Sequence, residues 1–213
     1  EIDNKPMIQW VIESLNLEGN FIFIVQKEHQ EKYNINSVLK ILKPNCKIIE
    51  LDHITEGAAC TTLLAKKFIN TSNPLIIANS DQYIKWDSIK SMYNYNQKKI
   101  DGSILTFEAI HPKWSYAKTD KNNFVTEVAE KKVISKNATV GVYYWKKGSD
   151  YVNCAETMIK KNIRVNNEFY VCPVYNEAIG EGKKIVIDKV SEMHGLGTPD
   201  DLKNFITKKN LTN

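Results

Sequence analysis

A carboxylate stands at an unusual place in this sequence. Residues 75–78, Leu-Ile-Ile-Ala, form a short apolar run that predicts a buried strand, and the run ends abruptly in Asn79-Ser80-Asp81-Gln82. Ligands of open α/β sheets bind beyond the carboxyl ends of the strands, so a binding role for Asp81 is one interpretation. Its anionic oxygens would suit a hard divalent cation that in turn holds phosphate groups. The alternative is turn chemistry, in which Asp81 or Asp87 begins the following helix.

The elements that would position Asp81 alternate between strand and helix through residue 107. Apolar runs predict strands at residues 21–25, 47–51, 74–78 and 103–107, and helical spacing predicts helices at residues 7–15, 28–43, 57–68 and 88–97. In the helix that Gly57 opens, Ala59, Leu63, Leu64 and Phe68 are expected to face inward. Short connections between alternating elements are typical of βαβ units and a doubly wound parallel sheet.

The pattern changes after about residue 115. Strands are expected at residues 124–129, 140–145 and 185–187, and helices at residues 151–161 and 199–208. The first two of these strands have no long helix between them, which predicts a mixed or antiparallel portion. We therefore expect an α/β fold of the Rossmann-like, three-layer α/β/α kind, with a mixed but mostly parallel sheet. Residues 1–213 are expected to form a single domain.

Composition limits the classes of function. The 213 residues are 42% hydrophobic and 25% charged, with a formal net charge of +4. The basic residues are scattered, so a nucleic-acid partner is not expected, although the mild positive balance suits a small anionic substrate. No apolar run is long enough to span a membrane. Cys46, Cys60, Cys154 and Cys172 form no CxxC motif, so we expect reduced, buried thiols in a cytoplasmic protein.

Five short phrases occur in an order and at spacings that resemble one enzyme family. They are Lys5-Pro6-Met7-Ile8, Thr55-Glu56-Gly57-Ala58-Ala59, Asn79-Ser80-Asp81-Gln82, Glu130-Lys131 followed by Gly141-Val142-Tyr143, and Gly195-Leu196-Gly197-Thr198-Pro199. Together they resemble nucleotidyltransferases of the nucleotide-diphospho-sugar pyrophosphorylase family over nearly the whole chain. The resemblance implies that a nucleoside triphosphate reacts with a phosphorylated acceptor, giving a nucleoside diphosphate conjugate and pyrophosphate.

The resemblance also implies roles for individual residues. Asp81 would bind Mg²⁺ and act with Lys131 in catalysis, and Lys131 would contact the phosphate of the acceptor. The nucleotide would lie against Glu56, Gly57, Ala58 and Ser80, and the acceptor against Tyr116, Glu130, Lys131 and Glu168. Trp114, Phe169 and Tyr170 are expected to serve packing rather than the pocket.

Two departures from the family pattern stand out. The family implies a Gly-x-Gly-x-Arg loop on a first strand just before the Lys5-Pro6-Met7 phrase, and the sequence contains no such segment. We therefore expect the domain to be incomplete at its N-terminal side. Many members also carry a second metal-binding aspartate where this chain has Gly195. Another aspartate such as Asp188, or water and substrate phosphates, would then complete the metal site.

Specificity is implied only by resemblance. The Asn-Ser-Asp-Gln and Asn-Glu-Phe-Tyr phrases resemble those of enzymes in bacterial capsule and surface-polysaccharide synthesis. This favours CTP as the nucleotide, with phosphoglutamine or a sugar 1-phosphate as the acceptor. Two alternatives remain: a non-catalytic nucleotide-binding paralogue, and a glycosyltransferase of similar fold. Glycosyltransferases usually show Asp-x-Asp at the metal strand, whereas this chain has Ser80-Asp81-Gln82. Oligomeric state has no signal in the sequence.

Overall fold

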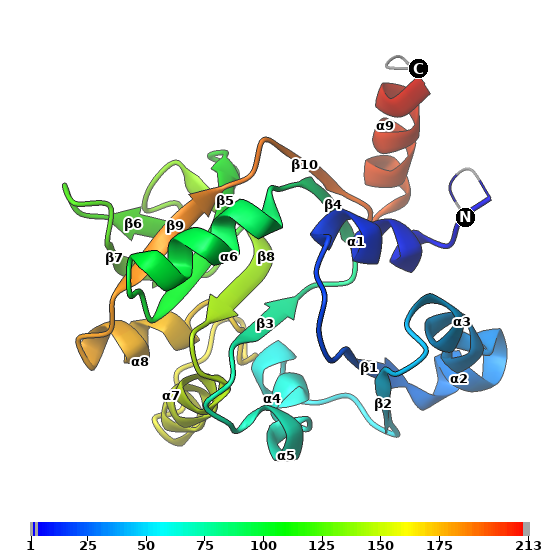
Figure 1. The fold of residues 1–213 in the computed structure, drawn as a ribbon, viewed down its shortest axis with the longest axis horizontal. Coiled ribbons are helices and arrows are strands. Elements are labelled where there is room, and N and C mark those ends of the chain that lie inside the picture. The colour runs from blue at the N-terminus through cyan, green and yellow to red at the C-terminus, as the bar shows by residue number, and fades with distance from the viewer. Residues whose placement is uncertain (1, 3, 211–213) are drawn as a thin grey trace.

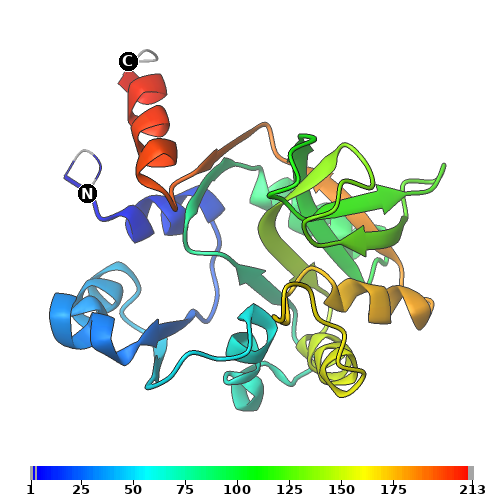
Figure 2. The ribbon, with the colours of Figure 1, turned by 180° about the vertical axis from the view of Figure 1, so that it is seen from behind.

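The chain folds as an α/β structure in which helices flank a central sheet, shown from two sides in Figure 1 and Figure 2. The computed structural model describes residue 2 and residues 4–210, apart from the side chains of residues 209 and 210. The expected Rossmann-like class is confirmed. Among the helices of these residues, none is both long and apolar enough to cross a membrane.

Apart from β4, which was not predicted, the elements follow the predicted order over the first half of the chain. They are α1 (Met7–Leu15), β1 (Ile22–Gln26), α2 (Lys27–Tyr33), α3 (Ile35–Leu42), β2 (Lys47–Leu51), α4 (Ala58–Leu63), α5 (Lys66–Ile69), β3 (Leu75–Ala78), β4 (Gln82–Lys85), α6 (Ser88–Gln97) and β5 (Gly102–Glu108). The helix expected at residues 28–43 is two helices, because Asn34 between them has a left-handed φ of 49°. The helix expected after Gly57 is also divided, and Leu64 at its break is exposed rather than inward.

The second half contains more strands than the sequence predicted. Its elements are β6 (Tyr116–Thr119), β7 (Val125–Ala129), β8 (Asn137–Trp145), α7 (Gly148–Lys160), α8 (Val174–Gly180), β9 (Ile185–Lys189), β10 (Glu192–Gly195) and α9 (Pro199–Asn210). Four elements were missed, namely β4, β6, β10 and α8. The three missed strands have four residues each, which is too short for a period-two pattern to emerge.

The sheet is mixed, but the expectation that it is mostly parallel is wrong for its paired strands. One sheet has the order β7-β6-β8-β5-β9, with β3 also paired to β8. Only β5–β9 and the separate pair β1–β2 are parallel, and the other described pairings are antiparallel. The reason is connection length: β6, β7 and β8 follow one another with too few residues between them for the helical crossover that a parallel pairing needs.

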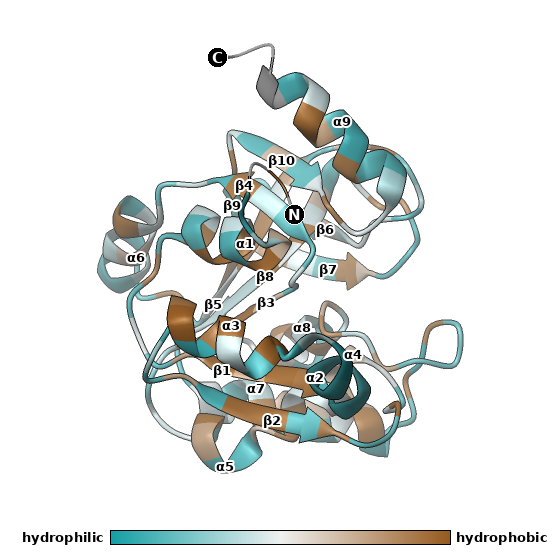
Figure 3. Cartoon of the chain, turned by 90° about the vertical axis from the view of Figure 1, so that its right-hand side faces the viewer, coloured by the Kyte–Doolittle hydropathy of each residue, from teal (hydrophilic) through white to brown (hydrophobic). Residues whose placement is uncertain are grey.

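Strand β8 is the centre of the sheet and is buried along almost its whole length. On one side Trp145 of β8 stacks on Tyr175 of α8, with ring centroids 4.3 Å apart. A second apolar cluster joins α1, β4, the end of β10 and α9 through Val11, Ile84, Leu196 and Phe205. Figure 3 shows hydrophobic segments on β1 and β2 and alternating hydropathy on α9. This second cluster fixes the chain that follows β10 against β4.

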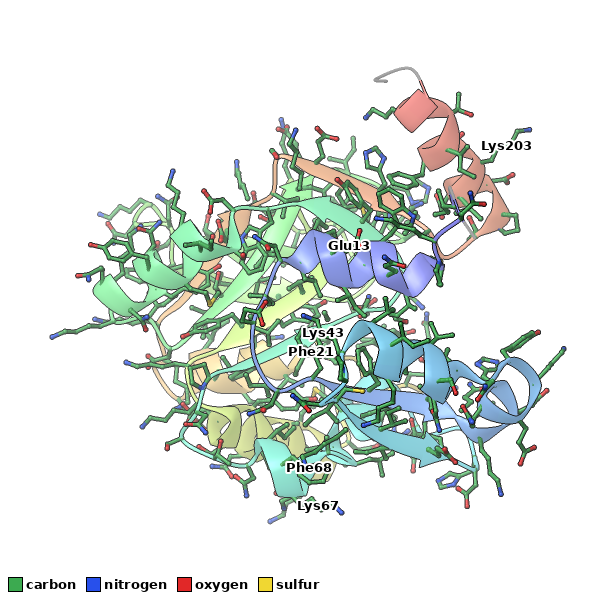
Figure 4. The ribbon with its side chains drawn as sticks, turned by 45° about the vertical axis from the view of Figure 1, so that its right-hand side comes forward. Glu13, Phe21, Lys43, Lys67, Phe68 and Lys203 are labelled. Carbon is green, nitrogen blue, oxygen red and sulfur yellow. The ribbon has the colours of Figure 1, made fainter. Side chains whose placement is uncertain are left out.

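Strands β1 and β3 face each other without pairing. Among the described strands β1 pairs only with β2, and β3 pairs only with β8. Two overlapping cavities of about 360 and 390 Å³ lie between them, both lined by residues 22–23 on one side and by Leu75, Ile76 and Ala78 on the other. We call this space the strand slot. Phe21 also lines this slot, and Lys43 Nζ lies over its ring, 4.4 Å from the ring centre (Figure 4).

Candidate active site

Asp81 lies in the short connection between β3 and β4. Strand β4 pairs antiparallel with β10, with Gln82 opposite Gly195, and the Leu196 amide donates to the Asp81 carbonyl at 2.7 Å. A Cβ atom at Gly197 would lie only 2.5 Å from Asp81 Oδ2. The Asp81 carboxylate therefore rests against the backbone of the Gly195–Gly197 segment, which follows it by more than one hundred residues in the chain.

The alternative role of Asp81 as a helix cap does not hold. The helix that follows is α6, and its N-cap is Asp87, whose side chain accepts a hydrogen bond from the Lys90 amide at 3.0 Å. Asp81 is instead followed directly by a strand. Capping therefore explains Asp87 and leaves the carboxylate of Asp81 without that structural role.

A cavity of about 420 Å³ opens beside Asp81, and we call it the main cavity. Its lining comes from the β3–β4 connection, the segments on either side of β6 and β7, strand β8, the chain before α8, and the β10–α9 segment. The lining residues used below are Ala58, Asn79, Asp81, Lys113, Trp114, Ser115, Glu130, Tyr170, Gly195, Gly197, Thr198 and Asp201. A cavity bordered by so many separate segments is typical of a ligand site.

Two carboxylates share one side of the main cavity. Burial is the main cause that raises the pKa of Asp81, and the negative charge of Asp201 raises it further. Lys113 Nζ lies 3.9 Å from Asp201 Oδ1. Among residues 2 and 4–210, no group of three or more His, Cys, Asp or Glu side chains could hold a metal ion. Two carboxylates beside an open cavity fit Mg²⁺, which typically takes one or two carboxylates together with water and substrate phosphates.

Asp188, the aspartate expected to complete a metal site, lies elsewhere. Its Oδ2 atom accepts hydrogen bonds from Trp86 Nε1 at 3.0 Å, Ser91 Oγ at 2.5 Å and Tyr95 OH at 2.6 Å. It lines a different cavity, beside α6 and β9. The carboxylate is occupied in joining α6 to the sheet, so the suggestion that Asp188 replaces the missing aspartate is wrong.

The residues expected at the nucleotide are only partly brought together. Ala58 lines both the main cavity and the strand slot, whereas Ser80 lines the strand slot alone. Gly57 has a φ of 128°, and a Cβ atom there would lie 2.6 Å from the Phe169 backbone. This close approach of two backbones is sufficient reason for a glycine. The Glu56 carboxylate forms an ion pair with Arg164, which limits its freedom to meet a ligand.

Lys131 stands at the edge of the main cavity. Its Nζ donates to the hydroxyl of Tyr170, a lining residue, at 2.7 Å, and lies 4.9 Å from the centre of that ring. The hydrogen bond to Tyr170 raises the pKa of Lys131. The backbone of Lys131 is left-handed, with φ of 53°, and its amide donates to the Trp114 carbonyl. Neighbouring Lys132 is exposed and offers a matched comparison.

The residues expected at the acceptor are also only partly brought together at the main cavity. Glu130 lines the main cavity and accepts a hydrogen bond from Ser115. Burial is the first cause that raises the pKa of Glu130, and the charge of exposed Glu168 adds to it. Glu168 is therefore near Glu130 but is not part of the lining. Tyr116 is fully buried and donates to the His111 carbonyl at 2.7 Å, so its expected place in the pocket is wrong.

Several lining residues were not predicted. Trp114 and Tyr170, expected to serve packing alone, line the main cavity, whereas Phe169 is buried as expected. Asn79 lines both the main cavity and the strand slot, and its backbone amide donates to the Gly141 carbonyl at 2.9 Å. Gly141 has a φ of 75°, and a Cβ atom there would lie 2.4 Å from Asn79 Nδ2. The Asn79 and Gly141 phrases were visible in the sequence, but their contact was not.

The sequence matches the nucleotidyl transferase family over residues 1–202. Among solved structures it is similar to a nucleoside-diphosphate-sugar pyrophosphorylase from Vibrio cholerae RC9, with 21% identity, a TM-score of 0.80, and coverage of 97% of this chain and 89% of that one.

Two further solved structures share the fold. A UDP-glucose pyrophosphorylase complexed with UDP-glucose has 13% identity and a TM-score of 0.75, over 99% of this chain and 89% of that one. A putative glucose-1-phosphate thymidylyltransferase from Bacillus anthracis, in complex with a sucrose, has 16% identity and a TM-score of 0.73, over 98% and 84%. No curated protein sequence matches this chain.

Glu130→Gln should change how stability depends on pH. Because burial raises the pKa of Glu130, the folded state keeps its proton at pH values where the unfolded chain has lost it. The free energy of unfolding therefore falls as pH rises through the interval above the ordinary glutamate pKa. Glutamine removes this cost and can still accept from Ser115. Chemical denaturation at pH 4 and pH 7 should show a stabilising effect of Glu130→Gln that is larger at pH 7.

Glu127→Gln is the control for that measurement, because Glu127 is exposed and its charge is not among those that shift the pKa of Glu130. It should leave the pH dependence of the free energy of unfolding close to that of the wild type. Equal stability of the wild type and Glu130→Gln at both pH values would contradict the conclusion that the half-buried position of Glu130 disfavours its charged form.

Proposed function

The chain belongs to the nucleotidyl transferase family, and from this premise we propose that it transfers a nucleoside monophosphate from a nucleoside triphosphate to a phosphorylated small molecule, with release of pyrophosphate. The observation that carries the proposal is the main cavity itself. It has Asp81 and Asp201 on one side, and Lys131 at its edge through Tyr170. Carboxylates to hold a cation and ammonium groups to meet phosphates are the two kinds of group that this transfer requires.

The reaction asks the chain for positioning rather than proton transfer. A phosphate monoester has its second pKa near 6 and is mostly dianionic at neutral pH, so an acceptor phosphate oxygen is already a nucleophile. That oxygen forms a bond to the α-phosphorus of the triphosphate as the bond from α-phosphorus to the pyrophosphate oxygen breaks. Asp81, with a second carboxylate, would hold Mg²⁺, which when bound offsets charge on the α-phosphate and the leaving pyrophosphate. Lys131 would orient the acceptor phosphate by a charge-assisted hydrogen bond.

For the substrates we propose CTP and an acceptor that is phosphoglutamine or a sugar 1-phosphate, in the synthesis of bacterial capsule or surface polysaccharide. The support is the resemblance of the Asn79–Gln82 and Asn167–Tyr170 phrases to those of such enzymes. The site has one feature suited to an acceptor with polar groups besides its phosphate: half-buried Glu130 lines the cavity beside Ser115. The competing function is a non-catalytic nucleotide-binding protein, which Gly195 in place of the family aspartate favours.

The strand slot supports the expectation of a further strand and glycine-rich loop. The facing edges of β1 and β3 are not paired with each other, and an extended segment between them would hydrogen-bond with the backbone groups of both edges. Asn79 and Ser80 line the slot at the end of β3, next to Asp81. A loop leaving such a strand would therefore enter the main cavity beside Asp81. Backbone amides of such a loop would bind the phosphates of the triphosphate.

We expect that a chain extended upstream by a strand and a glycine-rich loop turns over, whereas residues 1–213 alone turn over poorly. The added strand would fill the strand slot, and the added loop would provide the backbone amides that bind phosphate. The measurement is nucleoside triphosphate affinity and pyrophosphate release for both proteins. Equal affinity and rate would show that nothing belongs in the slot for activity.

Asp81→Asn should leave the protein folded and reduce turnover by about 100-fold or more, as the loss of several kcal/mol of charge stabilisation implies. Since Asp87 caps α6, the melting temperature should hardly change. The measurement is pyrophosphate release by the extended protein, screened over the four nucleoside triphosphates with phosphoglutamine and sugar 1-phosphates. A near-normal rate at low Mg²⁺ would remove the proposed role of Asp81. Absence of pyrophosphate release by the wild type would favour the non-catalytic alternative.

Lys131→Ala should weaken use of the acceptor far more than binding of the triphosphate. One charge-assisted contact is worth about 1.5–3 kcal/mol, or roughly 10- to 100-fold in kcat/KM for the acceptor. Lys132→Ala is the matched control, because Lys132 is the adjacent exposed lysine. The assignment of Lys131 fails if both variants behave alike, or if Lys131→Ala changes only the affinity for the triphosphate.

A further inference from the structure

Asp201, in the first turn of α9, had no predicted role in the sequence. We infer that Asp201 is the second carboxylate of the cation site, in place of the side chain that Gly195 lacks. This inference rests on the proposed function, since it concerns the same cation and the same cavity. It adds a residue that the family phrases do not point to, because the family position is Gly195 itself.

The two carboxylates lie against neighbouring glycines of one segment. A Cβ atom at Gly197 would lie 2.5 Å from Asp81 Oδ2, and a Cβ atom at Gly195 would lie 3.3 Å from both Cγ and Oδ2 of Asp201. Both aspartates line the main cavity. The Asp201 carboxylate therefore lies directly beside the position from which an aspartate at 195 would extend. Gly195 is the residue that leaves this space open for it.

Asp201 is held in place without using all of its acceptor capacity. Thr198 Oγ1 donates to Asp201 Oδ2 at 2.7 Å, and the Asp201 amide donates back to Thr198 Oγ1 at 3.1 Å. The other carboxylate oxygen, Oδ1, lies 3.9 Å from Lys113 Nζ, which is beyond hydrogen-bonding distance. Asp188 is different, because one oxygen of its carboxylate already accepts from three side chains.

The competing explanation is that Asp201 only caps α9. Thr198 precedes Pro199, and Asp201 is the third residue of the helix, which is the spacing of a capping box. Asparagine at 201 keeps the backbone amide and an oxygen that can accept from Thr198, so Asp201→Asn preserves the cap and removes only the charge. The variant therefore separates the two explanations.

The experiment measures binding of Mn²⁺ alone to the extended protein, by loss of the electron paramagnetic resonance signal of the free ion. Asp201→Asn should weaken Mn²⁺ binding by about tenfold or more, as Asp81→Asn should. Asp200→Asn is the matched control, because Asp200 is the adjacent exposed carboxylate and is not part of the cavity lining. It should bind Mn²⁺ as the wild type does, and all three variants should keep the wild-type melting temperature.

A double variant tests the position of the charge. Gly195→Asp combined with Asp201→Asn moves the carboxylate back to the family position, and it should recover most of the Mn²⁺ affinity that Asp201→Asn loses. If Asp81→Asn weakens Mn²⁺ binding and Asp201→Asn does not, the role of Asp201 is overturned while the proposed function stands. A lower melting temperature for Asp201→Asn, with no recovery of Mn²⁺ affinity in the double variant, would show that Asp201 caps α9 and does not bind the cation. Failure of the wild type to bind Mn²⁺ would count against the cation site of the proposed function as a whole.

Discussion

The candidate site depends above all on the antiparallel pairing of β4 with β10. This pairing sets Gln82 opposite Gly195, and the hydrogen bond from the Leu196 amide to the Asp81 carbonyl continues it by one step. It brings together two segments that are separated by more than one hundred residues. Without it, Asp81 would stand at the end of β3 with no neighbour from the C-terminal segment. The apolar cluster of α1, β4 and α9 stabilises the arrangement from behind.

Close backbone contacts shape the walls of the main cavity. The backbone of residues 56–59 meets that of Phe169 through hydrogen bonds from the Phe169 amide to the Glu56 carbonyl and from the Ala59 amide to the Phe169 carbonyl. Gly57 lies within this contact, where a Cβ atom would collide with Phe169. Gly141 of β8 approaches the Asn79 side chain in the same way. These glycines set how near the segments come, so their first effect is on the shape of the cavity, whatever ligand it binds.

The charged side chains around the main cavity lie in two groups. Asp81 and Asp201 lie together on the β10–α9 side, with Lys113 beside Asp201. Glu130 and Lys131 lie on another side, where Tyr170 fixes the lysine at the edge. Like charges held close together are unfavourable without a ligand, and a cation together with phosphate groups would relieve the repulsion. The arrangement therefore suits a polyanionic substrate that arrives with its cation.

The sequence by itself determined the class of fold, the position of most helices and long strands, and the choice of Asp81 and Lys131 as candidates. These follow from local information: hydrophobic period, strand length, and short phrases whose order resembles the family. The sequence did not determine β4, β6 and β10, because four residues are too few for a period to show. Nor did it predict the antiparallel majority of the sheet.

Only the tertiary structure decided which polar residues share the cavity. It excluded Tyr116, which faces the core, and Asp188, whose carboxylate is occupied by three donors. It added Asp201, whose place depends on the pairing of β4 with β10 and on the absence of a side chain at Gly195. The physical reason is that contacts between segments distant in the chain depend on packing and register. A local pattern of residues carries no information about either.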